Sequence, residues 1–283
     1  MQVGLYIVST PIGNLQDMTF RAISTLQQVA LALVEDTRQA RKLWDAYDIK
    51  TPMCVANQHT EKQIISRVLS NIEAGQSVAL ISDAGTPLIH DPGALLVPAV
   101  IAAGYSVIPV PGSCAAIAAL SVSGFDVSQF RFCGFLPAKG SEADKRLVAE
   151  AKTTVPLVFY EAPHRLHKTI ERMIQVLGAT REVVLARELT KRFETVHRCS
   201  LGALNQAIME GIVTVKGEMV IIVAGAKVTQ PSEKGEIILS TDKAVEVLLD
   251  QLSVKDAATI LSRISGLSQS KAYALCLSRK KTR

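Results

Sequence analysis

The hexapeptide Ser82-Asp83-Ala84-Gly85-Thr86-Pro87 lies between two apolar segments of different character. The run before it, residues 78–81 (Val-Ala-Leu-Ile), is short and continuous, which is typical of a buried β-strand. After it, Asp91-Pro92-Gly93 opens a helix-like apolar run at residues 95–101. A strand, a loop of small residues and a helix in this order predict an α/β protein with a ligand-binding loop at the carboxyl end of a strand.

The residues of this loop allow more than one interpretation. Gly85 permits a positive φ or a close backbone approach, and Pro87 stiffens the exit from the loop. The carboxylate of Asp83 suits a hydroxyl, ammonium or sulfonium group of a ligand. An ordinary βα turn with a capping aspartate explains the hexapeptide equally well when it is taken alone.

Similar strand-and-loop units occur throughout the first 120 residues. Strands are predicted at residues 5–8, 30–34, 52–55 and 105–110, and helices at residues 19–28 (capped by Asp17), 39–47, 63–74 and 115–121. This alternation predicts a mostly parallel, wound sheet. Neither the GxGxxG pattern of dinucleotide-binding folds nor the GxxxxGK[ST] pattern of P-loops occurs, so neither phosphate-binding function is supported.

The second half alternates strands and helices as well, with more hairpin-like connections. Strands are predicted at residues 132–137, 156–160, 181–185, 195–197 and 219–223, and helices at residues 142–152, 166–177 and 201–211. Residues 230–235 have the composition of a linker. Three helices follow at residues 242–252, 254–262 and 268–277, with helix-turn-helix spacing and a basic tail. A small bundle used only for packing is the alternative to a nucleic-acid reader.

The composition restricts the class of protein. A chain of 283 residues with 48% hydrophobic and 20% charged residues is expected to be globular, with two or three structural units. The apolar runs are too short to span a bilayer and the N-terminus lacks signal-peptide features, so we expect a cytoplasmic protein with no membrane partner. Five scattered cysteines without a CxxC pair predict free thiols and no metal site. The formal charge of +5 leans towards a polyanionic partner.

Seven motifs in one order are together far more specific than any one of them. They are Ser9-Thr10-Pro11-Ile12-Gly13-Asn14-Leu15, Glu35-Asp36-Thr37-Arg38, residues 82–87, Pro111-Gly112-Ser113, Phe159-Tyr160-Glu161, Ala186-Arg187-Glu188-Leu189-Thr190-Lys191 and Lys216-Gly217-Glu218. This order resembles the tetrapyrrole-methylase superfamily of S-adenosylmethionine-dependent methyltransferases, over essentially the whole chain. Within it, the chain is similar to the branch that 2′-O-methylates a cytidine of 16S ribosomal RNA and carries a helical C-terminal extension.

The resemblance implies a two-lobed enzyme that binds S-adenosylmethionine in the cleft between its lobes and works as a homodimer. We expect an N-terminal α/β lobe at residues 1–116, a second at 117–228, a linker at 229–240 and a helical extension at 241–283. The cofactor-binding residues implied by motif are Pro11, Ser82, Asp83, Ala84, Gly85, Pro87, Ser113, Ala115, Ala116, Tyr160, Leu189 and Gly217. Ser113 stands where proline is common in the family, a mild change that leaves the turn plausible.

The residue types agree with methyl transfer to a ribose. Displacement at a sulfonium methyl group depends mainly on alignment, and a poorly nucleophilic 2′-hydroxyl is helped by a general base. The candidate bases are Asp36, Glu35, Glu161 and Glu188, followed by His59, although salt bridges with Arg38 and Arg187 would explain several of these carboxylates. RNA phosphates could bind Arg38, Lys139, Arg165, Arg187 and Lys191.

The resemblance therefore implies S-adenosylmethionine-dependent 2′-O-methylation of a cytidine in the 16S rRNA of the small ribosomal subunit. The aromatic content of 5% argues against a large base-stacking platform, so we expect recognition by shape and backbone. A small-molecule methyltransferase acting on a tetrapyrrole is the alternative, and a non-catalytic RNA-binding protein is a third hypothesis. The missing glycine fingerprint argues against a nicotinamide oxidoreductase.

Overall fold

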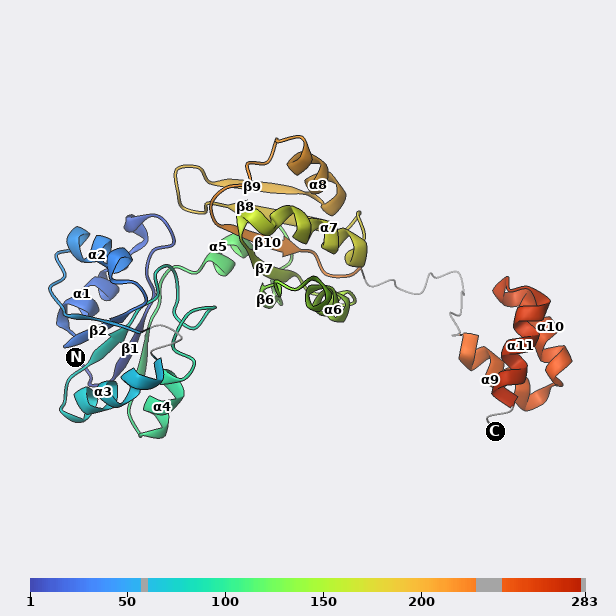
Figure 1. The fold of residues 1–283 in the computed structure, drawn as a ribbon, viewed down its shortest axis with the longest axis horizontal. Coiled ribbons are helices and arrows are strands. Elements are labelled where there is room, and N and C mark those ends of the chain that lie inside the picture. The colour runs from blue at the N-terminus through green and yellow to red at the C-terminus, as the bar shows by residue number, and fades with distance from the viewer. Residues whose placement is uncertain (57–60, 228–240, 281–283) are drawn as a thin grey trace. The chain divides into compact units, whose positions relative to one another are not determined.

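The protein divides into two compact units, Met1–Lys227 and Val228–Arg283, in a computed structural model that describes residues 1–56, 61–227 and 241–280 (Figure 1). The linker predicted at residues 229–240 and the end of the basic tail lie outside the described residues. Of the helices in the described part, none has the length and hydropathy of a membrane-spanning segment.

The first lobe of the larger unit is built on a five-stranded sheet. Its strands are β1 (Leu5–Val8), β2 (Leu31–Val34), β3 (Met53–Val55), β4 (Val78–Leu80) and β5 (Val107–Val110), in the order β3-β2-β4-β1-β5. Every pair is parallel, as the alternation of strands and helices predicts. The carboxyl ends of the strands therefore meet at one edge, where the loops of the sequence motifs follow.

Helices cover both faces of this parallel sheet, because alternate strand residues are apolar on both sides. Tyr6 and Val34 face a core shared with α1 (Phe20–Gln28) and α2 (Thr37–Ala46), whereas Leu5 faces the core on the other side. The helices α3 (Glu61–Glu73) and α4 (Leu96–Ala102) complete this second core. Both faces are thus removed from water, which explains the continuous apolar runs in these strands.

The start of α1 corrects one detail of the sequence interpretation. Thr19, not Asp17, is the N-cap, since its hydroxyl oxygen accepts a hydrogen bond from the backbone N–H of Ala22 at 3.1 Å. Asp17 ends a short 3₁₀ helix, Leu15–Asp17, in which Asn14 is the capping residue. Two caps within six residues fix the direction in which the chain leaves the first motif loop.

The second lobe contains a mixed five-stranded sheet. Its strands are β6 (Arg131–Phe135), β7 (Leu157–Glu161), β8 (Glu182–Arg187), β9 (Thr195–Ser200) and β10 (Met219–Val223), in the order β6-β7-β10-β8-β9. Only β6 and β7 are parallel, and the other three pairs are antiparallel. Pairing of β8 with β9 along six residues extends both strands beyond the predicted bounds, so Arg187 ends a strand rather than lying in a loop.

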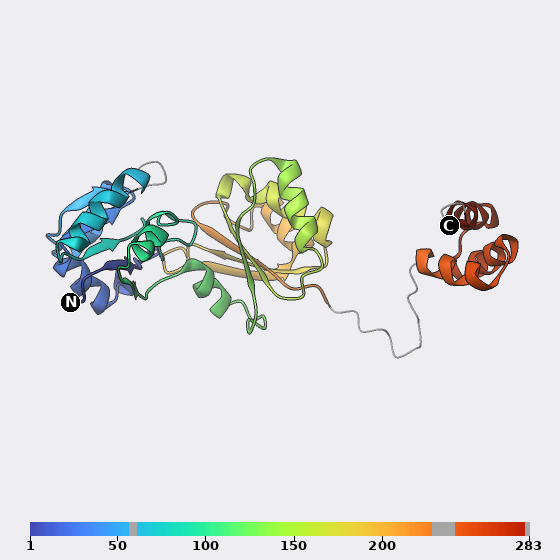
Figure 2. The same cartoon turned by 90° about the horizontal axis from the view of Figure 1, so that it is seen from below.

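The two faces of this second sheet have different partners. Residues such as Phe159 and Ile221 face α6 (Gly140–Glu150), α7 (Leu166–Leu177) and α8 (Leu201–Met209). Their neighbours in the chain, such as Val158, face the opposite way and pack against α5 (Ala115–Ser121), which lies on the other side of the sheet (Figure 2). The predicted lobe boundary at residue 116 therefore falls inside a helix that packs on the second sheet.

The smaller unit is a three-helix bundle of α9 (Thr241–Gln251), α10 (Val254–Ser265) and α11 (Gln269–Lys280). Its core is made mostly of small side chains: Ala257 and Ala272 are fully buried, together with Val245 and Cys276. The turn between α10 and α11 is made by Gly266, whose φ of 68° is one that glycine adopts without strain. The helical extension predicted from the sequence is confirmed.

A matched pair of substitutions on α6 tests the packing of the second lobe. Leu147 is fully buried in its core, while the adjacent Val148 is 62% exposed. Leu147→Ala should lower the free energy of unfolding by about 2–5 kcal/mol, because it removes buried methyl groups and leaves a cavity. Val148→Ala should change it by less than about 0.5 kcal/mol. Urea denaturation of both variants measures the difference, and equal losses would contradict the packing described.

Candidate functional site

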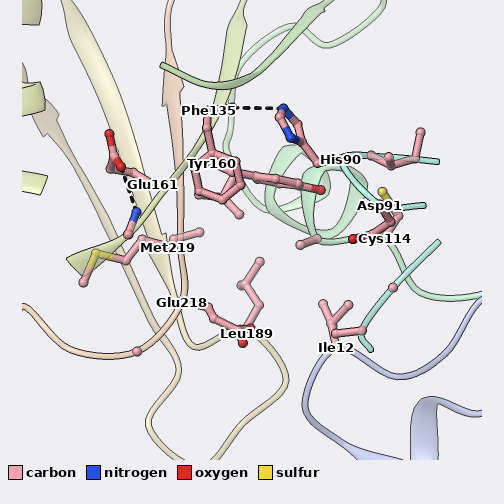
Figure 3. A pocket seen from close by; sticks show the side chains of 18 of the residues that line it. Ile12, His90, Asp91, Cys114, Phe135, Tyr160, Glu161, Leu189, Glu218 and Met219 are labelled. Atoms are coloured by element: carbon pink, nitrogen blue, oxygen red, sulfur yellow. Dashed lines mark hydrogen bonds between the residues drawn. The ribbon is translucent and has the colours of Figure 1, made fainter. Parts of the chain in front are cut away.

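A cavity of about 360 Å³ opens between the two lobes of the larger unit (Figure 3). From the first lobe it is lined by Ile12, Ala84, Gly85, Thr86, Ile89, His90, Asp91, Cys114 and Ala115. From the second lobe it is lined by Phe135, Tyr160, Glu161, Ala162, Pro163, Ala186, Leu189, Gly217, Glu218, Met219 and Val220. Its volume and its mainly apolar walls with a few polar groups are typical of small-molecule sites.

The first-lobe wall is held together by hydrogen bonds between loops that are far apart in sequence. Thr10 and Gly85 exchange two backbone hydrogen bonds, of 2.8 and 3.1 Å, which join the loops after β1 and β4. The hydroxyl of Thr86 donates to the carbonyl oxygen of Ser113 at 3.0 Å and lies 2.9 Å from the Ser9 hydroxyl. The three motif loops of the first lobe thus form one continuous surface.

The second-lobe wall comes from the ends of β7, β8 and β10. The Tyr160 hydroxyl on β7 accepts a hydrogen bond of 3.3 Å from the backbone N–H of Ala116, which connects the two lobes. After β8, Glu188 adopts a positive φ of 52°, and its carboxylate accepts from the backbone N–H of Glu218 at 2.9 Å. This contact fixes the loop that presents Leu189 to the cavity.

His90 is a cavity residue that the sequence interpretation did not single out. Its Nε2 accepts a hydrogen bond of 3.2 Å from the backbone N–H of Phe135, 45 residues further along the chain (Figure 3). The imidazole also lies edge-on to the ring of Phe135, with centroids 5.1 Å apart. The pairing of β6 with β7 shifts register between Phe132 and Gly134, and Gly134, with φ of 63° and no side chain, leaves room for the imidazole. No local sequence pattern indicates this contact, since the partners belong to different lobes.

Six of the predicted cofactor-binding residues line the cavity: Ala84, Gly85, Ala115, Tyr160, Leu189 and Gly217. The other six, Pro11, Ser82, Asp83, Pro87, Ser113 and Ala116, do not line it, although three of them bond to residues that do. Asp83 accepts a hydrogen bond of 3.1 Å from the backbone N–H of Asp36. Its carboxylate thereby ties the loop after β4 to the end of β2.

Glu161 is the one predicted base whose residue lines the cavity, but its carboxylate is fully engaged. It is 3% exposed and accepts hydrogen bonds from the Ala162 N–H at 2.8 Å and the Thr169 hydroxyl at 2.5 Å. The guanidinium of Arg165 lies 3.3 Å away. Both oxygens thus make hydrogen bonds within the lobe, which favours a role in fixing the start of α7 over the catalytic role predicted for Glu161.

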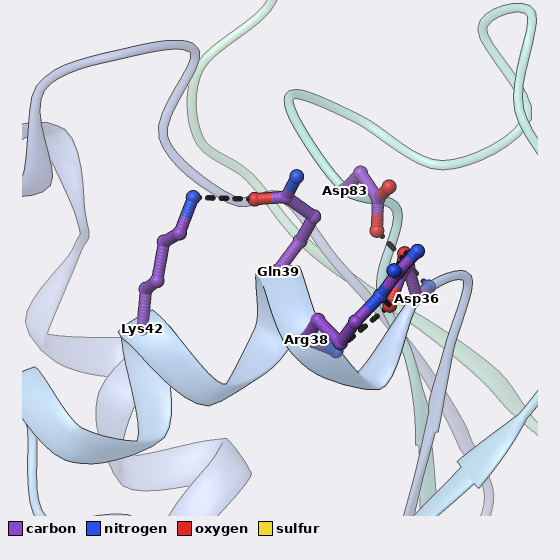
Figure 4. Close-up of polar contacts among 5 residues, drawn as sticks. All are labelled: Asp36, Arg38, Gln39, Lys42 and Asp83. Carbon is purple, nitrogen blue, oxygen red and sulfur yellow. Dashed lines mark hydrogen bonds and ion pairs between the residues drawn. The ribbon is translucent and has the colours of Figure 1, made fainter.

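Glu188 and Asp36 are likewise engaged and lie outside the cavity lining. Burial alone would raise the pKa of Glu188, but hydrogen bonds from the Glu218 backbone and the Lys191 side chain lower it. Asp36 is the N-cap of α2 and pairs with Arg38 through contacts of 2.6 to 3.1 Å (Figure 4). Hydrogen bonds from the Arg38 side chain lower the pKa of Asp36. Both carboxylates therefore hold the fold locally.

Glu35, the remaining predicted carboxylate, also lies outside the lining. Burial raises its pKa, and the negative charge of Asp83 raises it further. It lies beside the cavity residue Asp91, whose pKa its charge also raises. His59, the last of the predicted bases, lies outside the described residues.

Comparison with known proteins decides the family. The model of the tetrapyrrole (corrin/porphyrin) methylases matches residues 4–205 of this chain. The chain belongs to this family. The resemblance predicted from the motif order is thus confirmed, as is the two-lobed fold with a helical C-terminal region.

Curated relatives resemble this tetrapyrrole methylase over almost their whole length. A protein of Pseudomonas aeruginosa is 42% identical over 276 residues, which cover 98% of this chain and 97% of the relative. Proteins of Haemophilus influenzae and Escherichia coli O157:H7 are 43% and 42% identical, over 95% and 96% of this chain and 94% of each relative. All three are named ribosomal RNA small subunit methyltransferase I.

Solved structures share the fold of this tetrapyrrole methylase at low sequence identity. A cobalt precorrin-4 methyltransferase superposes with a TM-score of 0.58 and 17% identity, over 78% of this chain and 94% of that chain. A uroporphyrin-III C-methyltransferase of Thermus thermophilus, complexed with S-adenosylhomocysteine, gives 0.56 and 18%, over 78% and 97%. At this identity the match establishes the fold.

The donor set of the cavity fits S-adenosylmethionine, the cofactor of this family. The apolar side chains of Ile12 and Leu189 in the cavity wall suit an adenine ring. Gly85, with φ of 86°, has no side chain and lets backbone groups approach a ligand closely. Ala84, Gly85, Ala115, Tyr160, Leu189 and Gly217 are the residues we expect to hold it.

Three of the cationic residues predicted to bind RNA make hydrogen bonds or ion pairs within this methylase. Arg187 is 8% exposed and donates to the carbonyl oxygens of Lys216 and Phe193 at 2.8 and 2.9 Å. Arg165 donates to the carbonyl oxygen of Leu136 at 2.6 Å and pairs with Glu161. Both guanidinium groups thus donate hydrogen bonds within the protein, which makes them weaker candidates for phosphate contacts than the sequence predicts.

Lys191 pairs with two carboxylates of the second lobe, and its side chain also contacts the first lobe. Its ammonium group lies 2.9 Å from Glu188 and 3.1 Å from Glu218. Its stem covers Gly13, where an added Cβ would lie 2.3 Å from the Lys191 Cγ. The side chains of Arg38 and Lys139, in contrast, are 88% and 73% exposed. These two remain accessible for phosphate contacts.

Substitution at Gly134 tests the contact that His90 makes with the second lobe. An alanine Cβ there would lie 1.9 Å from the His90 Nε2, in addition to the strain of a positive φ. Gly75→Ala is the matched control, because its φ of 76° imposes the same backbone strain with nothing within 4 Å.

We expect Gly75→Ala to cost about 1–2 kcal/mol of unfolding free energy, the usual cost of a left-handed non-glycine residue. Gly134→Ala should cost at least about 1 kcal/mol more, since His90 must leave its hydrogen bond to Phe135. Urea denaturation of the two variants gives the comparison. Equal destabilisation would show that the His90 contact contributes nothing to folding.

Proposed function

We propose that this protein transfers the methyl group of S-adenosylmethionine to the 2′-hydroxyl of a cytidine ribose in the 16S rRNA of the small ribosomal subunit. The observation that carries the proposal is the 42–43% identity to ribosomal RNA small subunit methyltransferases I along nearly the whole of both chains. Such coverage includes the helical extension. We further propose that the protein acts in the cytoplasm as a homodimer.

Bound S-adenosylmethionine supplies an electrophilic methyl group on a sulfonium, and the residues of the chain supply alignment. The loops of the first lobe, fixed by the Thr10–Gly85 bonds, form one wall and the ends of β7, β8 and β10 form the other. Apolar groups such as Ile12 and Met219 exclude water from the cavity. Holding the reactants in line in such a site can supply several kcal/mol, roughly 7–11, of the barrier reduction.

RNA binding is proposed for the exposed cations and the helical unit. Arg38 lies at the carboxyl edge of the first sheet, beside the loop of Asp83, and its guanidinium is largely exposed. Lys139 lies just before α6 in the second lobe and is also largely exposed. With a formal charge of +5 on the chain, these groups favour a polyanionic substrate.

A methyl-transfer assay tests the proposed reaction. Radiolabelled S-adenosylmethionine is incubated with the protein and small ribosomal subunits, or with free 16S rRNA, and the labelled RNA is digested to nucleosides. We expect the label in 2′-O-methylcytidine, with the adjacent phosphodiester bond resistant to alkali. Label on a base, or transfer to a tetrapyrrole but to no RNA, would contradict the proposal.

Deletion of residues 236–283 tests the proposed role of the helical unit. Every cavity-lining residue lies between Ile12 and Val220, so the truncated protein should bind S-adenosylmethionine with nearly the same dissociation constant in calorimetry. Its transfer to RNA should be lost, because the unit proposed to contact RNA is gone. Full RNA methylation by the truncated protein would assign the three helices a role other than substrate binding.

A further inference from the structure

Six titratable side chains belong to residues that line the cavity: His90, Asp91, Cys114, Tyr160, Glu161 and Glu218. Proton transfer from a ribose hydroxyl requires an acceptor with a free lone pair that faces the bound substrates. The contacts of each group decide whether it has one. The carboxylate of Glu161 does not face the bound substrates freely, since it is 3% exposed, accepts hydrogen bonds from its own lobe on both oxygens and lies 3.3 Å from the guanidinium of Arg165.

The aromatic side chains of His90 and Tyr160 are also engaged in hydrogen bonds. The Nε2 of His90 accepts from the Phe135 backbone, so a neutral imidazole carries its proton on Nδ1 and has no lone pair left. Burial raises the pKa of Tyr160 far above its usual range, so the phenol stays protonated. Its hydroxyl accepts from the Ala116 N–H and shares a hydrogen bond with the thiol of Cys114, so Cys114 is engaged as well.

Glu218 and Asp91 differ in where their carboxylates lie. Glu218 is 72% exposed and pairs with Lys191 at 3.1 Å, which neutralises it at the mouth of the cavity. Asp91 is half-buried, and the neighbour that lowers its pKa among the described residues is the neutral hydroxyl of Ser82, so no cation is paired with this carboxylate there. A half-buried carboxylate that lines the cavity and has no paired cation is the expected form of a general base.

Three elements bring charged or titratable groups to Asp91. Glu35 at the end of β2 and Asp83 after β4 are negative, and Tyr160 on β7 is neutral. Burial, opposed by the Ser82 hydrogen bond and aided by these two negative charges, raises the pKa of Asp91 to about 6. Asp91 thus lines the cavity and is close enough to Glu35 and Asp83 for their charges to raise its pKa.

We propose that the Asp91 carboxylate is the general base of the methyl transfer, an assignment that rests on the proposed function. As the ribose 2′-oxygen forms its bond to the methyl carbon, the bond from that carbon to sulfur breaks. The sulfur keeps the electron pair and becomes a neutral thioether. The hydroxyl proton passes to Asp91, which later releases it to solvent.

The pKa of the Asp91 carboxyl group suits a general base. A carboxylate with a pKa near 6 is mostly ionised at pH 7.5 and accepts a proton more readily than an ordinary aspartate. Protonation below that pKa removes the base, so kcat/KM should fall as the pH drops through about 6. Removal of the Glu35 charge should lower the pKa of Asp91 and move this inflection to lower pH.

Asp91→Asn in the full chain tests the assignment, with Asp126→Asn as the matched control. Asp126 is exposed and accepts a hydrogen bond from the Ser128 N–H in a turn away from the cavity. We expect Asp91→Asn to lower kcat by about 10²–10⁴-fold, the usual range for loss of a general base. Its dissociation constant for S-adenosylmethionine should stay within about threefold, and Asp126→Asn should match the wild type in both.

Two readouts separate catalysis from a structural role. The acid inflection of kcat/KM should shift to lower pH in Glu35→Gln and be absent from the residual activity of Asp91→Asn. Calorimetry at pH 6 in buffers of different ionisation enthalpy should detect proton release when the cationic cofactor binds the wild type, and little release in Asp91→Asn. These measurements on wild type and Glu35→Gln decide the matter even where Asp91→Asn fails to fold.

The contrary outcomes are distinct. A wild-type protein that methylates RNA together with an Asp91→Asn variant of comparable kcat overturns the role of Asp91 alone. Loss of cofactor affinity at unchanged kcat, or a flat profile down to pH 5, also overturns it. A wild-type protein that binds S-adenosylmethionine but methylates no RNA overturns the proposed function, and the assignment with it.

Discussion

Two reciprocal backbone hydrogen bonds between Thr10 and Gly85 hold the functional edge of the molecule together. They join the loops that follow two neighbouring parallel strands, β1 and β4, just beyond the end of the strand pairing. Gly85 sustains the φ of 86° that this geometry needs. Because Thr86 then reaches Ser113, a third loop is added, and one wall of the cavity becomes a continuous surface.

The second wall of the cavity depends on a sheet whose two faces pack against different helices. One face packs against α6, α7 and α8 and supplies the stability of the lobe, while the other accepts α5, the helix that follows the third motif loop. Because α5 lies directly on this sheet, the Tyr160 hydroxyl can bond to its first turn at Ala116. The cavity therefore lies where a chain crossing between lobes is fixed to both.

Charge near the cavity is organised mainly to hold loops rather than to meet a substrate. Arg187 ends a strand and satisfies two loop carbonyl groups, and Lys191 joins two carboxylates while covering Gly13. A buried guanidinium that donates to carbonyl groups of its own lobe is oriented towards the protein and not towards a phosphate in solution. Asp91 differs in having no cationic partner among the described residues, and burial keeps its pKa high.

The sequence alone determined the fold class and the position of almost every strand and helix, because periodicity and small-residue loops are local properties of the chain. The order of the motif loops was enough to indicate the family and half of the cavity lining, including Gly85 and Tyr160. Which acidic group faces the cavity was decided by tertiary structure. Glu161 is satisfied by Thr169, which the folding of α7 brings to it. In the sequence, Asp91 resembles a residue that opens a helix. Its surroundings could not be predicted, because the neighbours that raise its pKa, such as Glu35, lie far away in sequence.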